Sequence, residues 1–533
     1  MQEQKLADAS TVVPSPRPRE RTQRVVPALT VISHPDLQRA GERLVLAALA
    51  TQESVAVSRT APEFKFPGAL QGMALADPFL SRKPLVFEPG PDGGVRLRVE
   101  EGGTSVRVGE SPLVGAQEFT PKALAEGVPL VLADRIVLWL HQVPDDTPTA
   151  TEGLGMVGYS TGVRRVREGI SQVADLKVPV LIRGETGSGK ELVAQAIHRI
   201  SPRKAGPFVS VNLGALSKEL AAAELFGARK GAYTGSVQDR DGYFRAAHGG
   251  TLFLDEVGEA PPEVQALLLR VLETGEVYPV GGHSSVAVDV RLIAATDADL
   301  EERIRDELFK APLLHRLAGY EIRVPPLRER REDIGVLFHH FARQELEALG
   351  ETHRLEVKDA RAEPWLPAAV ALQLLRYSWP GNIRQLRNLS RQIVIGSRSQ
   401  PVLQLSPHIE QELNSTPPAV SEPVPERRTR QKPEGASSRR RPSEVSDEEM
   451  REALSATGWD MKAAAERLGI TRPSLYMLID KSPSLRTAVE LSPEEITRCF
   501  HECNGDLDAM VQRLQVSKRG LQRRVKDLGL VTS

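Results

Sequence analysis

The sequence predicts a multidomain protein with an all-β sandwich, an α/β domain and an all-α tail. Three observations support this fold class. Short strands fill residues 28–143, a strand, a glycine-rich loop and a helix follow one another from Val178, and the tail contains an internal repeat of helical segments. At 533 residues the chain is too long for one hydrophobic core.

The overall composition excludes two broad classes of protein. A net charge of −1 excludes a uniformly basic nucleic-acid coat but permits a local basic patch. The chain has no run of 18 apolar residues, and the segment after Met1 lacks the apolar core of a signal peptide. Cys499 and Cys503 are the only cysteines, too few for a metal site of their own. We therefore expect a soluble, cytoplasmic protein without a membrane partner.

The first 143 residues predict a disordered lead followed by a small β-sandwich. Residues 1–27 are rich in Pro, Arg, Ser and Thr without periodicity. Residues 28–143 alternate apolar and polar positions between Gly, Pro and Asp turn signals. The strands that we expect cover residues 29–32, 54–58, 85–87, 95–99 and 135–140.

Two loops of this region resemble those of a forkhead-associated (FHA) domain, a reader of phosphothreonine peptides. Ser81 and Arg82 match the pair that grips the phosphate, and Thr104 matches a threonine in a second loop. The resemblance implies a phosphothreonine protein as a partner. Pro84 replaces the family's structural His, and Arg107 replaces the Asn that contacts peptide backbone. The alternative is a degenerate sandwich that only contacts the next domain or a partner.

A short linker over 144–156 leads to a phosphate-binding loop. Val178–Arg183 is a β-branched apolar run, and a glycine-rich loop ending in Lys190 separates it from a helix over 191–200. Such a loop turns successive backbone N–H groups toward an anion at the positive end of the helix. We expect the loop to bind ATP, with Lys190 on the β- and γ-phosphates. The nucleotide-binding residues are Gly184, Glu185, Thr186, Gly187, Ser188, Gly189, Lys190 and Glu191.

Further strands at 207–212, 251–255 and 289–295 predict a parallel α/β sheet. The strand at 251–255 is wholly apolar before it ends in two carboxylates, Asp255 and Glu256, as in a Walker B motif. Asp255 is expected to hold Mg²⁺, and Glu256 to orient or deprotonate the attacking water. Together with the P-loop, this pattern predicts hydrolysis of ATP.

Five motifs in order resemble the AAA+ domain of the sigma-54-dependent activators over residues 157–398. They lie at 184–191, 224–236, 252–256, 324–330 and 379–384. The resemblance implies an α/β subdomain over 157–330 and a helical lid over 331–398. It also implies a homo-oligomeric ring, expected to be a hexamer, that remodels sigma-54 RNA polymerase by hydrolysing ATP.

The resemblance also assigns individual residues. Around the nucleotide it implies that Asn212 pairs with Glu256, that Thr296 and Asp297 form sensor I, that Arg384 is sensor II, and that Gly158 and Tyr159 pack the adenine. It implies that Lys310 and Arg316 are arginine fingers, which act in the site of a neighbouring subunit. The residues that it implies contact sigma-54 are Gly231, Ala232, Tyr233, Thr234, Gly235 and Ser236.

Three of these positions depart from the family pattern. Asp297 replaces an Asn, Ser236 replaces an Ala, and Lys310 keeps the charge of an Arg but loses its planar fork. They leave open a DNA-binding regulator or repressor whose ring does not activate sigma-54. A general AAA+ remodeller with another client is disfavoured by the 231–236 loop.

The remaining residues predict a flexible basic linker over 399–445 and two copies of one helical unit. Residues 446–481 align without gaps on 492–527. The first copy (446–482) resembles the Fis-type helix-turn-helix, which implies binding to double-stranded DNA upstream of promoters through Thr471, Arg472, Ser474 and Tyr476. The second copy (490–530) is more basic, and either DNA binding or a dimerisation bundle fits it.

Overall fold

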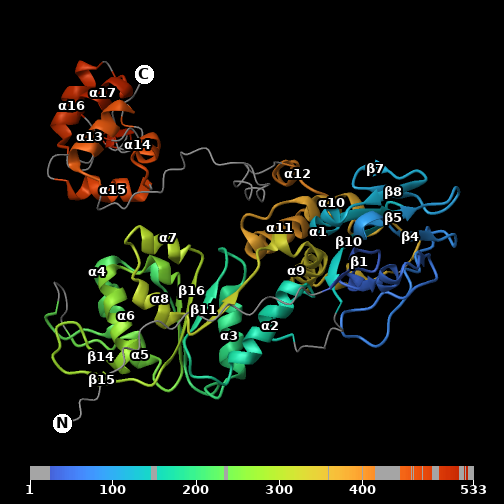
Figure 1. Cartoon of the computed structure of the whole chain (residues 1–533), viewed down its shortest axis with the longest axis horizontal. Helices are drawn as coiled ribbons and strands as arrows, with labels where there is room; N and C mark the ends of the chain where they lie inside the picture. The colour runs from blue at the N-terminus through green and yellow to red at the C-terminus, as the bar shows by residue number, and fades with distance from the viewer. Residues whose placement is uncertain are drawn as a thin grey trace, which may run out of the picture.

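The computed structural model describes residues 24–145, 153–232, 238–357, 359–398 and 400–414 (Figure 1). In the tail it describes residues 445–457, 459, 461–470, 472–482, 491–503, 505–514, 516, 521, 522, 524, 525 and 528. Within these residues no helix is both long and apolar enough to cross a membrane.

The N-terminal region forms two antiparallel sheets, which confirms the predicted β-sandwich. One sheet has the order β2-β1-β10-β9-β6-β7 and the other β3-β4-β5-β8. The strands are β1 (Val25–Ser33), β2 (Arg43–Val45), β3 (Val55–Val57), β4 (Leu85–Pro89), β5 (Val95–Arg98), β6 (Val106–Val108), β7 (Ser111–Pro112), β8 (Ala116–Phe119), β9 (Val128–Leu132) and β10 (Ile136–Pro144), and α1 (Pro121–Glu126) precedes β9. Because β1 begins at Val25, the predicted lead of 1–27 is three residues too long. Residues 1–23 lie outside the described part.

Strand β10 is buried on both faces, unlike a strand at the surface of an ordinary sandwich. Ile136, Leu138 and Leu140 point into the sandwich core. Val137 and Trp139 point the other way and join the core of the helical lid. The continuous apolar run of this strand therefore reflects a second partner, since a sheet with one wet face would alternate.

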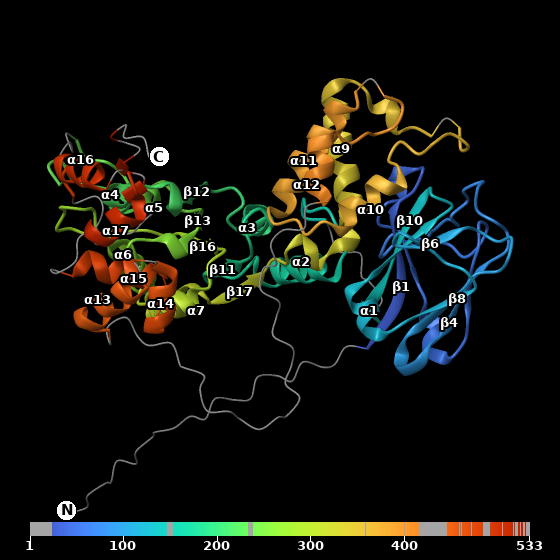
Figure 2. The ribbon, with the colours of Figure 1, turned by 90° about the horizontal axis from the view of Figure 1, so that it is seen from above.

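The nucleotide-binding domain is a parallel sheet of order β12-β13-β16-β11-β17, as predicted. Its strands are β11 (Val180–Arg183), β12 (Phe208–Asn212), β13 (Thr251–Asp255), β16 (Arg291–Thr296) and β17 (Tyr320–Arg323). Helices α2 (Thr161–Val173) and α3 (Lys190–Ile200) pack on one face. On the other face lie α4 (Lys218–Phe226), α5 (Tyr243–Ala246), α6 (Pro262–Thr274) and α8 (Ala311–Leu317), with α7 (Leu300–Arg305) beside them. Figure 2 shows this layer separated from the sandwich by the lid.

The sequence prediction omitted one strand of this sheet, β17. β17 reads Tyr-Glu-Ile-Arg and buries only Ile322 fully, so its apolar signal is weak. A short hairpin of β14 (Glu276–Val277) and β15 (Val286–Ala287) also went unpredicted.

The lid consists of α9 (Ile334–Leu349), α10 (Ala368–Arg376), α11 (Asn382–Gly396) and α12 (Pro407–Asn414). Helix α12 corrects the predicted boundary, because it lies inside the segment 399–445 that we expected to be a linker. Leu403, Ile409 and Leu413 are buried in the lid core, so the lid continues to residue 414.

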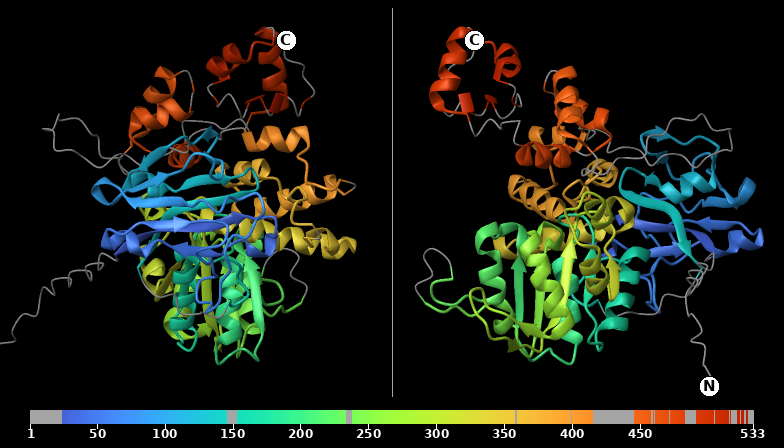
Figure 3. Two further views of the ribbon diagram at one scale, coloured as in Figure 1. Left: turned by 90° about the vertical axis from the view of Figure 1, so that its right-hand side faces the viewer. Right: turned by 60° about the vertical axis from the view of Figure 1, so that its left-hand side comes forward.

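The sandwich is docked on the lid rather than tethered to it (Figure 3). Gly335 of α9 lies so close to β1 that a Cβ there would be 2.0 Å from the Ile32 carbonyl oxygen. Arg135 pairs with buried Asp77 at 2.9 Å and donates to the carbonyls of Ala360 and Ala362 in the lid, at 2.8 and 2.9 Å. This agrees with the alternative of a sandwich that contacts the ATPase domain.

The tail contains α13 (Asp447–Ala456), α14 (Met461–Leu468), α15 (Arg472–Lys481), α16 (Pro493–Glu502) and α17 (Leu507–Leu514). The first three helices confirm a helix-turn-helix arrangement in 446–482. The last two, with helical residues at 521, 522, 524 and 525, follow the predicted second copy. Cys499 and Cys503 are free thiols, buried and half-buried.

Candidate nucleotide site

The P-loop joins β11 to α3 with the backbone that its glycines require. Gly187 has φ of +77° and Gly189 of +107°, conformations that L side chains rarely adopt. Lys190, only 6% exposed, donates to the Gly184 carbonyl at 2.9 Å, and its Nζ lies 3.5 Å from Glu256 Oε1. The loop and the Lys190 ammonium group are thus held in position before any phosphate binds.

The two predicted carboxylates lie at the end of β13, and Glu256 faces this lysine. Asp255 Oδ1 accepts a hydrogen bond from the Glu256 backbone N–H at 3.0 Å. Glu256 adopts φ of +55°, an uncommon value that re-aims its side chain away from the strand direction. Asn212 stands beside Asp255 in the register of β12 and β13. Its Oδ1 accepts from the Ala215 N–H at 3.1 Å and caps a turn, while the Glu256 carboxylate lies beside Lys190.

Asp297 brings a third carboxyl group to the site. Its Oδ2 accepts from Thr186 Oγ1 of the P-loop at 2.6 Å. Burial raises the pKa of Glu256, and a hydrogen bond with Asp297 and the nearby negative charges raise it further against the opposing charge of Lys190. Burial acts in the same sense on Asp297, but hydrogen bonds with Thr186 and Glu256 and the charge of Lys190 bring the pKa of Asp297 below its usual value. The proximity of Asp297 therefore opposes the ionisation of Glu256.

The start of lid helix α11 clamps the P-loop. Asn382, fully buried, donates to Glu185 Oε2 and to the Thr186 carbonyl, both at 3.1 Å, and accepts from the Leu327 N–H at 2.8 Å. The Arg384 backbone N–H donates to the Gly187 carbonyl at 3.3 Å. A Cβ on Gly187 would lie 2.4 Å from the Gly381 carbonyl oxygen, so only glycine fits. Arg384, the predicted sensor II, is exposed beside this contact.

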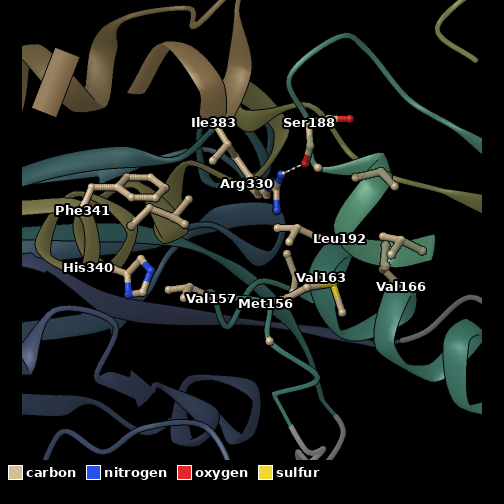
Figure 4. A pocket seen from close by; sticks show the side chains of 15 residues that line it. Met156, Val157, Val163, Val166, Ser188, Leu192, Arg330, His340, Phe341 and Ile383 are labelled. Carbon is tan, nitrogen blue, oxygen red and sulfur yellow. Dashed lines mark hydrogen bonds between the residues drawn. The ribbon is translucent and has the colours of Figure 1, made fainter. Parts of the chain in front are cut away.

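An apolar pocket lies next to the P-loop between α2, α3 and the lid (Figure 4). Met156 and Val157 come from the segment before α2, Leu192 from α3, and Phe341 and His340 from α9. The guanidinium of Arg330 closes one end and donates to the Ser188 carbonyl at 3.1 Å. The mostly apolar lining suits a flat, largely apolar ring.

Gly158 and Tyr159, the predicted adenine contacts, do not line this pocket. The backbone N–H groups of Tyr159 and Ser160 both donate to Asp333 Oδ1, at 2.6 and 2.9 Å. The Tyr159 ring packs at a tilt of 37° against Phe66 of the sandwich, with 5.3 Å between ring centroids. Asp333 thereby holds this segment on the lid, and the residues two or three positions earlier face the pocket.

Four other predicted residues lie away from the reacting end. Glu191 is exposed and accepts from Gln195 at 3.2 Å. Thr296 is buried, and its Oγ1 accepts from the Ala298 N–H at 3.1 Å within its own turn. Lys310 caps α8, and Arg316 on the same helix is 59% exposed with Glu273 Oε1 at 3.6 Å. Neither cation lines the pockets beside its own P-loop, as a residue acting on a neighbouring subunit requires.

The predicted sigma-54 loop is described only at its base. Gly231 is exposed with φ of +80°, and Ala232 lies against Gly281 in the loop of the β14–β15 hairpin. Arg229 and Asp239 close the base with a 2.5 Å ion pair. Tyr233, Thr234, Gly235 and Ser236 lie outside the described residues.

The three candidate phosphopeptide residues of the sandwich come together. The Ser81 N–H donates to Thr104 Oγ1 at 2.9 Å, which joins the two loops. Arg82 is exposed beside them, and the neighbouring Lys83 N–H donates to Ser81 Oγ at 3.1 Å.

In the first helix-turn-helix, Tyr476 is exposed on α15 and Arg472 begins that helix. Ser474 corrects the prediction: it is 1% exposed, so its small side chain packs inward and does not face a DNA groove. Thr471 lies outside the described residues.

Sequence reasoning missed Asn382, Asp333 and the pocket residues of α9. Asn382 lies inside the motif at 379–384, where a polar residue beside Pro and Gly at a helix start was the available signal. Asp333 lies in a run of charged residues that looks like an exposed surface.

Comparison with known proteins identifies three regions. Residues 156–323 match the sigma-54 interaction domain, 328–422 the AAA+ ATPase lid domain, and 442–479 the bacterial regulatory protein, Fis family. The DNA-binding transcriptional regulator NtrC of Klebsiella pneumoniae is 42% identical over 291 residues, 54% of this chain and 60% of that protein. The chain thus spans about 60% of the length of this relative.

A second relative is similar over a longer stretch. The Nif-specific regulatory protein of Klebsiella oxytoca is 38% identical over 382 residues, 68% of each chain. A solved structure, NtrX from Brucella abortus in complex with ATP, is 30% identical over 61% of this chain and 68% of that one, with a TM-score of 0.43. On the family model of its central domain and the extent of the Nif-regulator match, this chain belongs to the family of transcriptional regulators that carry the sigma-54 interaction domain.

Proposed function

We propose that this chain is an ATP-driven activator that binds DNA upstream of promoters and remodels sigma-54 RNA polymerase. The observation that carries the proposal is the assembled ATPase centre, in which Lys190, Glu256 and the lid residue Asn382 meet around one P-loop. The matches to a sigma-54 interaction domain and a Fis-type helix-turn-helix support the two partners.

The catalytic roles rest on charge and position. ATP places its phosphates on the P-loop backbone and Lys190, and its base in the apolar pocket beside Met156 and Phe341. Glu256 orients the attacking water and takes its proton, for which its side chain must be ionised. Asn382 holds Glu185 and Thr186, so the loop keeps its shape while the phosphates change charge.

The site also fits Mg²⁺. The described residues contain no cluster of three His, Cys, Asp or Glu side chains that could hold a metal alone. Asp255 at the strand end is a suitable oxygen ligand, and the buried Ser188 hydroxyl has no hydrogen-bond partner among the described residues. Such a site suits an ion that uses one carboxylate, water and phosphate oxygens. The ion would neutralise charge on the phosphates.

A ring of subunits completes the centre. The exposure of Arg316 and Lys310 on α8, away from their own P-loop, supports roles as fingers in a neighbour's site. The loop at 231–236, based on the Arg229–Asp239 pair, is the proposed contact with sigma-54. The sandwich is proposed to bind a phosphothreonine peptide through Ser81, Arg82 and Thr104.

A second candidate function is a DNA-binding regulator whose ring does not activate sigma-54. The contact of Asp297 with Thr186 and Glu256 favours it, because a third carboxyl group beside the catalytic acid opposes its ionisation.

A reconstituted sigma-54 transcription assay tests the proposal. Wild type should form open complexes only with hydrolysable ATP, and Glu256→Gln should bind ATP but lose at least 100-fold in hydrolysis. Thr234→Ala should hydrolyse ATP without opening promoters. Glu263→Gln, which removes an exposed carboxylate on α6, is the matched control and should behave as wild type. If wild type binds DNA and hydrolyses ATP but opens nothing, the second candidate replaces the first.

A further inference from the structure

The second copy of the tail repeat has the same architecture as the first. The bounds of α16 and α17 match those of α13 and α14 at a constant offset, with Pro493–Glu502 on Asp447–Ala456 and Leu507–Leu514 on Met461–Leu468. The first helix of each copy is capped alike, since Ser446 Oγ accepts from the Glu449 N–H at 3.3 Å and Ser492 Oγ from the Glu495 N–H at 3.1 Å.

The buried positions also coincide. In the first copy Met450, Ala464, Ala465, Leu468, Ile470, Leu475 and Ile479 are buried, and in the second Ile496, Met510, Val511, Leu514, Val516, Leu521 and Val525. Leu475 and Leu521, both fully buried, mark the third helix of each copy. The second copy thus has buried residues at the same positions in all three helices as the first copy. A single dimerisation helix would not require this pattern.

The two copies do not form separate domains, because their buried side chains belong to one hydrophobic core. Both therefore lie at a fixed separation within a single globule of one chain. The match to the Fis family ends at residue 479, so it does not extend to the second copy.

The charge of the second copy points to the partner. Residues 517–527 contain five Lys and Arg side chains, whereas the corresponding residues 471–481 contain two. Gln522, on the third helix, is exposed. Lys518, Arg519, Arg523 and Lys526 lie outside the described residues, so this charge is a property of the sequence. A sequence this basic suits the charge of a DNA backbone.

We propose that the second copy is itself a DNA-binding unit, so that one chain contacts double-stranded DNA at two places, by the first copy through base edges and by the second mainly through phosphates. This rests on the proposed DNA binding of the first copy. A protein with a single helix-turn-helix needs two chains to contact two half-sites, whereas here one chain supplies both units.

Three steps test this: selection of duplexes from a random library by the full chain, footprinting of the DNA backbone on a selected duplex, and titration against salt. For wild type we expect a two-part site, seen as two separate protected stretches of backbone. For Lys518→Ala/Arg519→Ala/Arg523→Ala, one part should be lost and the slope of log K against log salt should fall by about 2–3, or ~0.9 per phosphate contact. Gln522→Glu, a single change at an exposed position, should weaken binding in the same direction without risk to the core.

Arg498→Ala is the matched control, because it removes an exposed positive charge from α16 of the same copy. It should leave the slope unchanged. If the triple variant and Gln522→Glu both keep the wild-type slope and site, or weaken only the association of chains in sedimentation, the proposal is overturned in favour of a dimerisation module. If Tyr476→Ala also leaves binding unchanged, the proposed DNA-binding role of the first copy fails separately.

Discussion

Replacing Asn382 by glycine should loosen the lid from the P-loop. The side chain makes three hydrogen bonds, to Leu327, Glu185 and Thr186. The two bonds to backbone groups contribute about 1 kcal/mol each. The bond to Glu185 contributes a similar ~1 kcal/mol, less than a buried charged bond, because that carboxylate is 40% exposed and keeps Arg328. We therefore expect a loss of about 3 kcal/mol in unfolding free energy.

Alanine at the same position separates the hydrogen bonds from the backbone conformation. Asn382 has φ of +53°, which glycine adopts freely and alanine does not. Asn382→Ala should thus cost about 1 kcal/mol more than Asn382→Gly. Asn388→Ala, an exposed change on the same helix, should leave stability within about 0.5 kcal/mol of wild type.

Urea unfolding followed by tryptophan fluorescence measures the stability change, because Trp139, Trp365 and Trp379 are all buried in the lid core. We also expect Asn382→Gly to raise the Kd for ATP, because the P-loop loses the partner that holds Glu185 and Thr186. Equilibrium binding of a fluorescent ATP analogue measures this change. A cost below 1 kcal/mol for Asn382→Gly together with an unchanged Kd would refute the clamp.

Three further changes test other parts of the structure. Asp297→Asn removes a negative charge and hydrogen-bond partner that raise the pKa of Glu256, so that pKa should fall; since hydrolysis needs ionised Glu256, the acidic limb of the kcat profile should move to lower pH, and an unmoved limb would contradict the coupling. Gly335→Ala should cost about 1–3 kcal/mol or more, because its Cβ would lie 2.0 Å from the Ile32 carbonyl oxygen, whereas Gly396→Ala, with open space around it, should be neutral or stabilising in thermal unfolding. Arg135→Ala leaves Asp77 buried and unpaired and should cost about 3–5 kcal/mol and expose the junction of sandwich and lid to limited proteolysis, while Arg107→Ala, which breaks an exposed pair with Asp134, should cost less than about 1 kcal/mol; equal effects would refute the docking.

Local sequence determined the chemistry of the central domain. The order of apolar run, glycine loop and Lys190 is enough for a P-loop, because it needs only adjacent residues and backbone conformations that glycine permits. Asp255 and Glu256 were predicted for the same reason, since a buried strand places the residues at its carboxyl end on one edge of a parallel sheet. The tail repeat was visible because each copy is a local helical unit.

Tertiary structure alone decided which distant groups meet. Asn382 reaches Glu185 from the start of lid helix α11, 197 residues along the chain. Asp333 fixes Tyr159 on the lid, so that Met156 and Val157 line the pocket beside the P-loop. The position of Ser474 in the helix-turn-helix sequence predicted a DNA contact, but its side chain is buried like that of a core residue. Local propensity specifies the elements, but which faces they bury depends on packing between segments far apart in the chain. The docking of the sandwich on the lid shows the same division: the apolar run of β10 predicted a strand, and only the folded chain shows that its second face belongs to the ATPase domain.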